Sequence, residues 1–148
     1  MTVAVDSPKV TSARRPRVLV VDDQDAIREA MAEMLIELGM AVVGTARDGG
    51  QAVDLADTSE ADVVLMDLRM PGVDGLEATR LIKERRPLTQ IIIYSAYDDP
   101  ALHRGADEVG AFCYLVKGCR PQLVYEMLGM AWAHAAGQVG SAADPSLG

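Results

Sequence analysis

Cysteine and histidine are scarce in this chain of 148 residues, which limits the chemistry available to it. The two cysteines, Cys113 and Cys119, are too few for a disulfide framework and lack the paired spacing of a zinc site. Because Cys113 lies within an apolar segment, we expect it to be a buried, reduced thiol. The two histidines, His103 and His134, are far apart in sequence, and we expect them at surface or rim positions.

The chain also has few basic residues and no long apolar segment. The chain has 14 Lys and Arg residues against 22 Asp and Glu residues, a formal net charge of −8. Because nucleic acid affinity depends on neutralising phosphates, we expect no direct nucleic acid binding by this chain. No apolar run is long enough to span a bilayer, and the start lacks a basic segment followed by an apolar core. We therefore expect a cytoplasmic protein with no membrane contact.

The length and the 49% hydrophobic content predict one globular domain with short extensions. Residues 1–16 contain Pro, Ser, Thr and Arg without periodicity, and we expect them to form a flexible extension. We place the domain at residues 17–136. Residues 137–148 are small and polar with one proline, which predicts a flexible tail or a truncated linker.

Strand and helix patterns alternate five times along the domain. Apolar segments at 17–23, 41–46, 63–66, 91–96 and 112–117 read as strands. Helices are expected from Asp25, an N-cap candidate, to Gly39, and then over 48–57, 75–85, 100–109 and from Pro121 onward. Because parallel strands need crossover connections, the alternation predicts a doubly wound α/β fold with a parallel sheet.

The strand ends concentrate the polar chemistry. Asp67 closes the central apolar strand, the pair Asp22 and Asp23 closes the first, and Ser95 and Lys117 close the fourth and fifth. In parallel sheets these ends meet at one edge, where ligands bind. Three crowded carboxylates require a cation, and few hard oxygen ligands suit Mg²⁺. A hydroxyl and an ammonium group beside them are donors for phosphoryl oxygens.

Each of these residues alone has an ordinary explanation. The acid pair can be a solvated turn or a helix cap, Ser95 a strand-end hydroxyl, Lys117 a surface charge, and Asp67 a turn former before Pro71. Their combination, in this order on alternating strands, is what indicates a site for a phosphoryl group.

With these residues in view, the chain resembles the receiver domain of bacterial two-component response regulators. The resemblance covers about residues 17–136 and rests on segments 18–23, 67–75, 94–96 and 110–117. It implies a flavodoxin-like (βα)5 fold with a five-stranded parallel sheet. It also implies that Asp67 accepts a phosphoryl group from the phosphohistidine of a sensor histidine kinase.

The resemblance assigns a role to each site residue. Asp23 and Asp67 would bind Mg²⁺ directly, the backbone carbonyl of Arg69 would be the third protein ligand, and Asp22 would act through water. Lys117 would pair with the carboxylate before transfer and with the phosphoryl group afterwards.

Two further positions match the switch of the family. Ser95 matches the hydroxyl that bonds the phosphoryl group, and Tyr114 the aromatic residue that turns inward behind it. The switching surface, and a possible homodimer interface, would lie within about residues 100–136.

Two departures from the common pattern stand out. Gly118 follows Lys117 where the family often has a proline with a cis bond, so we expect a trans bond here. The sequence Lys117-Gly-Cys resembles the subfamily whose receivers precede a helix-turn-helix output domain.

Arg69 and Tyr97 occupy positions that tune the lifetime of the acyl phosphate in this family.

Two other functions remain open at this stage. A Mg²⁺-dependent phosphohydrolase with an aspartyl-phosphate intermediate typically carries a second acid two residues after the nucleophile, where this chain has Arg69. A pseudo-receiver would bind its partner without phosphorylation. A stand-alone receiver and a receiver cut from a longer DNA-binding regulator also remain open.

Overall fold

The fold is a five-stranded parallel sheet covered by helices on both faces. The computed structural model describes residues 15–143, and their side chains as far as residue 137. The strand order is β2-β1-β3-β4-β5, which places β3 at the centre. The strands are β1 (Arg17–Val21), β2 (Ala41–Ala46), β3 (Val63–Met66), β4 (Gln90–Ser95) and β5 (Cys113–Val116). The predicted doubly wound α/β class and five-stranded parallel sheet are therefore confirmed.

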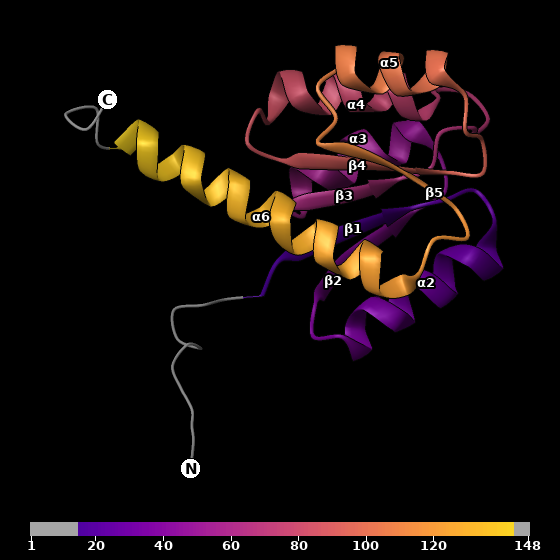
Figure 1. Ribbon diagram of the computed structural model, residues 1–148, viewed down its shortest axis with the longest axis horizontal. Helices are drawn as coiled ribbons and strands as arrows, with labels where there is room; N and C mark the ends of the chain where they lie inside the picture. The colour runs from indigo at the N-terminus through magenta and orange to yellow at the C-terminus, as the bar shows by residue number, and fades with distance from the viewer. Residues whose placement is uncertain (1–14, 144–148) are drawn as a thin grey trace.

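In the part of the chain that the structure describes, five helices follow the strands in turn. They are α2 (Asp25–Glu37), α3 (Gly49–Thr58), α4 (Gly75–Arg85), α5 (Pro100–Glu108) and α6 (Pro121–Ala143). Figure 1 shows α3, α4 and α5 on one face of the sheet and α2 and α6 on the other. The apolar residues of β1 and β3 alternate between these two layers, so that Val64 and Met66 pack toward the first and Val63 and Leu65 toward the second. All four side chains of β3 are buried, which explains its apolar sequence.

Local sequence signals set most of the helix starts. The side chains of Asp48, Asp74 and Asp99 cap α3, α4 and α5 by accepting backbone N–H hydrogen bonds. The expected cap of the first helix is wrong. Gln24 is the N-cap of α2 and makes no side-chain cap bond, whereas Asp25 is the first helical residue and pairs with Arg28 instead.

The last helix is longer than expected. It begins at Pro121, as predicted, but continues to Ala143, so the proposed end of the domain at residue 136 falls inside it. Residues 137–143 contain Ala, Gln and Val and no proline, so they can continue a helix in spite of two glycines. Figure 1 shows this end of α6 extending past the sheet. The other expected extensions, at residues 1–14 and 144–148, lie outside the described residues.

Candidate functional site

The carboxyl ends of the strands place four of the predicted side chains together. Asp22 and Asp23 follow β1, Asp67 follows β3 and Lys117 follows β5. Backbone bonds continue the sheet one residue past these strands, since the Asp67 N–H donates to the Val21 carbonyl (2.9 Å) and the Lys117 N–H to the Ser95 carbonyl (2.7 Å). The side chains are therefore held by the regular sheet and not by mobile loops.

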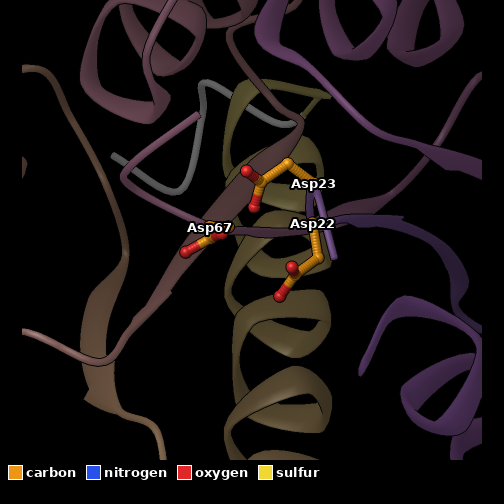
Figure 2. A group of neighbouring side chains, drawn as sticks. All are labelled: Asp22, Asp23 and Asp67. Carbon is orange, nitrogen blue, oxygen red and sulfur yellow. The ribbon is translucent and has the colours of Figure 1, made fainter. Parts of the chain in front are cut away.

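Three carboxylates form the acidic part of the site. One oxygen from each of Asp22, Asp23 and Asp67 lies within 4.8 Å of the others. Figure 2 shows the three side chains gathered at the ends of neighbouring strands. Asp22 and Asp67 are only 3% and 7% exposed, whereas Asp23 faces solvent. Burying two like charges this close is unfavourable without a compensating cation.

Lys117 supplies one compensating charge. Its Nζ lies 2.8 Å from Asp22 Oδ2 and 3.3 Å from Asp67 Oδ1. Burial works to lower the pKa of Lys117, but its hydrogen bonds and charge interactions with Asp22 and Asp67 hold that pKa above its ordinary value. The ammonium group is therefore charged and bridges the two buried acids.

The single positive charge of Lys117 does not fully neutralise the carboxylates of the site. Burial and the nearby Asp22 charge raise the pKa of Asp67 from 3.8 to about 6, although Lys117 and the Leu68 N–H work to lower it. Asp67 Oδ1 accepts the Leu68 N–H bond (2.9 Å) and lies next to Lys117. Within residues 15–143, Asp67 Oδ2 and the Asp23 carboxylate accept no hydrogen bond from protein. These oxygens remain available to a ligand.

The two oxygens of Asp22 are in a different situation. Its Oδ2 is bonded to Lys117, and its Oδ1 accepts a hydrogen bond from the Gln24 N–H (2.9 Å). The Arg28 guanidinium donates to the Asp22 carbonyl (2.8 Å). Arg28 was missed in the sequence analysis, and its spacing of three residues from Asp25 was the available signal.

The loop after Asp67 returns closely to the strand end. The Gly75 N–H donates to the Leu68 carbonyl (2.8 Å), and a Cβ at Gly75 would lie 2.2 Å from the Asp67 carbonyl oxygen. Only glycine fits at this approach. The loop from Asp67 to Gly75 is thus closed at both ends by backbone contacts.

Ser95 and Tyr114 connect through Tyr97. Ser95 is fully buried, and its Oγ accepts a hydrogen bond from the Tyr97 N–H (3.1 Å). The Tyr114 hydroxyl donates to the Tyr97 carbonyl. The Arg69 guanidinium lies over the Tyr97 ring, 4.6 Å from its centroid. The structure therefore joins the two predicted switch residues through a residue that the sequence analysis linked only to acyl-phosphate lifetime.

The remaining sequence expectations have mixed outcomes. Both cysteines are free, but Cys113 is only partly buried, and that burial raises the pKa of its thiol to about 11. The described residues 15–143 contain no cis peptide bond, so the bond between Lys117 and Gly118 is trans, as predicted. No helix in this part of the chain has the length and apolar character needed to span a bilayer.

An acidic cluster with a bridging lysine and a buried serine, at the carboxyl edge of a five-stranded parallel sheet, defines the class of receiver-like α/β domains. The chain belongs to the response regulator receiver domain family, whose model matches residues 18–129. The resemblance inferred from the sequence is confirmed.

Relatives of known sequence support this assignment. The chain is 42% identical over 101 residues to the transcriptional regulatory protein PdtaR of Mycobacterium tuberculosis, covering 68% of this chain and 49% of that protein. It is 41% identical over 108 residues to the response regulator UvrY of Escherichia coli, covering 72% and 50%. The chain thus spans about half the length of the curated relatives it matches.

Solved structures agree in fold. The signal receiver domain of the response regulator NarL from Mycobacterium tuberculosis is 33% identical with a TM-score of 0.75, covering 80% of this chain and 98% of that one. CheY in the CheX-CheY-BeF3-Mg²⁺ complex from Borrelia burgdorferi is 25% identical with a TM-score of 0.74, covering 79% and 89%.

Proposed function

We propose that this receiver domain accepts a phosphoryl group on Asp67 from the phosphohistidine of a sensor histidine kinase in the cytoplasm. An Asp67 carboxylate oxygen attacks phosphorus, the phosphorus–nitrogen bond of the phosphohistidine breaks, and its electron pair stays on the imidazole nitrogen. The observation that carries the proposal is the ammonium group of Lys117 bridging Asp22 and Asp67 at the sheet edge. With a pKa near 6, Asp67 is ionised at neutral pH, as a nucleophile must be.

The residues present fit a Mg²⁺ ion. Three carboxylates within 4.8 Å are hard oxygen donors, and two of them retain unbonded oxygens. Asp23 and Asp67 would hold the ion directly with the backbone carbonyl of Arg69. Asp22 would act through water, because both of its oxygens are already engaged. When bound, Mg²⁺ neutralises charge on the carboxylates and the phosphoryl oxygens. The similar CheY structure with BeF3 and Mg²⁺ supports this assignment.

The chain's own residues then provide positioning and a response. Lys117 would pair with a phosphoryl oxygen once Asp67 carries the group. Ser95 would leave the Tyr97 N–H to donate to another phosphoryl oxygen, and Tyr114 would turn inward behind it. The added group brings about −1.5 to −2 charges, which is enough to shift Ser95 and Tyr114 between two arrangements.

The response would be read on the surface of α5, β5 and α6, which we call the switch surface (residues 100–136). We propose that it controls a partner or an output domain, with homodimerisation as one form of control. PdtaR is named a transcriptional regulatory protein and UvrY a response regulator, which supports a role in transcription regulation. Binding of nucleic acid would belong to that output and not to this acidic domain.

The residue at position 69 does not support the alternative function of a phosphohydrolase. A hydrolase of this type places an acid there, whereas the Arg69 side chain is a cation lying over Tyr97. Self-dephosphorylation is compatible with the same site, since water can attack the acyl phosphate.

Intact mass after incubation with Mg²⁺ and acetyl phosphate tests the proposal, with size exclusion of the same samples. We expect one phosphoryl adduct that hydroxylamine removes and that Asp67→Asn abolishes. Labelling of the Asp67→Asn variant at another residue would overturn the Asp67 assignment. If free phosphate accumulates without an adduct, beryllofluoride binding separates rapid turnover of a receiver from hydrolase activity. Absence of both adduct and phosphate would favour a pseudo-receiver.

A further inference from the structure

Asp22 is held by a hydrogen bond at each of its oxygen atoms. Its Oδ2 is bonded to Lys117 and its Oδ1 to the Gln24 N–H. Its backbone carbonyl accepts a bond of 2.8 Å from Nη1 of Arg28. Because Arg28 lies on α2, this last bond crosses the turn that connects β1 to α2 and joins the end of the strand to the helix.

The Arg28 side chain is itself held in a defined orientation. Its Nη2 donates to Asp25 Oδ1 (2.6 Å), and its side chain is only 13% exposed, whereas that of Asp25 is 74% exposed. A planar guanidinium that donates to two groups at once has a fixed geometry. The bond to the Asp22 carbonyl is therefore made by a side chain with little freedom to move away.

The carbonyl that Arg28 bonds belongs to the peptide unit between Asp22 and Asp23. A peptide unit is planar, so holding its carbonyl also holds the backbone nitrogen of Asp23. The Asp23 carboxylate is exposed, and among the described residues it accepts no hydrogen bond. The main chain therefore sets the position from which the Asp23 carboxylate comes within 4.8 Å of Asp67.

We propose that Arg28 is a positioning residue for the metal site, which holds the Asp22–Asp23 peptide unit so that the Asp23 carboxylate can share an ion with Asp67. This inference rests on the proposed function. Arg28 acts through the backbone of Asp22 and supplies no ligand. Its charge opposes this role, because a cation near the site repels Mg²⁺. Positioning and charge therefore predict opposite changes of Mg²⁺ affinity when Arg28 is removed.

Arg47 is the matched control for the charge. It lines a cavity of about 540 Å³ together with Asp23 and a smaller one of about 200 Å³ together with Arg28, so its cation lies in the same neighbourhood. Among the described residues, the Arg47 guanidinium makes no hydrogen bond and no ion pair. Arg47→Met therefore removes the same charge as Arg28→Met without removing a bond to the Asp22 carbonyl.

Calorimetric titration of Mg²⁺ at neutral pH into the parent chain, Arg28→Met, Arg28→Lys and Arg47→Met tests the proposal. Methionine keeps a long apolar stem in place of the arginine stem. We expect Arg28→Met to bind Mg²⁺ about tenfold more weakly than the parent, as is typical when an outer partner of a metal ligand is lost. Arg47→Met should bind it equally well or up to about threefold more tightly, because a repelling charge is removed.

Arg28→Lys separates the geometry of Arg28 from its charge and replaces Arg28→Met if that variant does not fold. Lysine keeps the charge but not the planar fork, so its Mg²⁺ affinity should be at least about threefold weaker than that of the parent. A second readout needs no metal. In EDTA, the Gln24 amide, which donates to Asp22 Oδ1, should exchange its hydrogen faster in both Arg28 variants and at the parent rate in Arg47→Met.

The direction of the change in Mg²⁺ affinity decides the outcome. An affinity of the Arg28 variants equal to or above that of the parent overturns the role of Arg28 and leaves the proposed function intact. Equal losses in Arg28→Met and Arg47→Met also overturn it, because the loss would then not depend on the bond to the Asp22 carbonyl. A parent chain that binds no Mg²⁺ overturns both the inference and the proposed function.

Discussion

Replacement of Asp67 by asparagine should stabilise the metal-free protein, in contrast to most substitutions of buried residues. The carboxyl is 7% exposed, and its pKa rises from 3.8 to about 6 on folding. Because the folded state then binds the proton more tightly than the unfolded state, ionisation opposes folding. The cost is absent below pH 3.8, grows as the pH rises toward 6, and is complete above it.

The pKa change fixes the size of this effect. At about 1.4 kcal/mol per pKa unit, a rise from 3.8 to about 6 costs on the order of 3 kcal/mol above pH 6. About half of that cost, roughly 1.5 kcal/mol, develops between pH 5 and pH 8. Asparagine has a similar shape and no charge, so Asp67→Asn should remove the pH-dependent cost of ionising this residue in the folded state.

Urea unfolding in EDTA at pH 5, 6, 7 and 8 measures this difference. The free energy of unfolding of Asp67→Asn minus that of the parent should grow by roughly 1.5 kcal/mol over the range. Asp23→Asn is the control, because the Asp23 carboxyl is exposed and should show little of this growth. A constant difference, or one that shrinks with rising pH, would refute the reasoning about Asp67.

Three further predictions follow from the same site. Protons and Mg²⁺ compete for Asp67, so calorimetric Mg²⁺ affinity should be steady above pH 6 and fall below it, toward about tenfold per pH unit; equal affinities at pH 5 and 7 would contradict this. Lys117→Ala should retain Mg²⁺ binding but impair switching, and an unchanged activated-state NMR spectrum would speak against that role. Gly75→Ala should lower the free energy of unfolding, measured in urea, by at least about 2 kcal/mol, because its Cβ meets the Asp67 carbonyl. Gly129→Ala, in open space on α6, is the control and should be neutral or stabilise by about 0.5–1 kcal/mol. Equal effects of the two substitutions would argue against the close approach at Gly75.

The sheet and its edge were predictable because local sequence carries the information. Each strand is a short apolar run, and the residue that ends the run is the residue that parallel topology delivers to the site. Asp67 after 63–66 is the plainest case, since four buried apolar residues lead directly to the acid. The strand order and connections can then be predicted without knowing any side-chain contact.

Contacts between elements were out of reach of the same reasoning. The stack of His103 on Tyr114 joins a helix to a strand, and neither residue carries a local signal for the other. The role of Gly75 depends on how closely its loop returns to Asp67. The N-cap of the first helix was predicted wrongly because Asp22, outside the helix, accepts a hydrogen bond from the Gln24 N–H and organises the turn. The end of α6 at Ala143 was missed because small residues suit a tail and a helix alike.

The strand order has a consequence for how such a domain can diversify. Asp67 directly follows β3, which has hydrogen-bonded neighbours on both sides, whereas Tyr114 lies on β5 at the margin of the sheet, with one neighbouring strand only. Substitutions near Tyr114 have room to be absorbed by side-chain rearrangement, while those near Asp67 must be accommodated by two strands at once. Under the proposed function, partner choice could therefore change at the margin of the sheet without disturbing the phosphoryl transfer proposed at its centre.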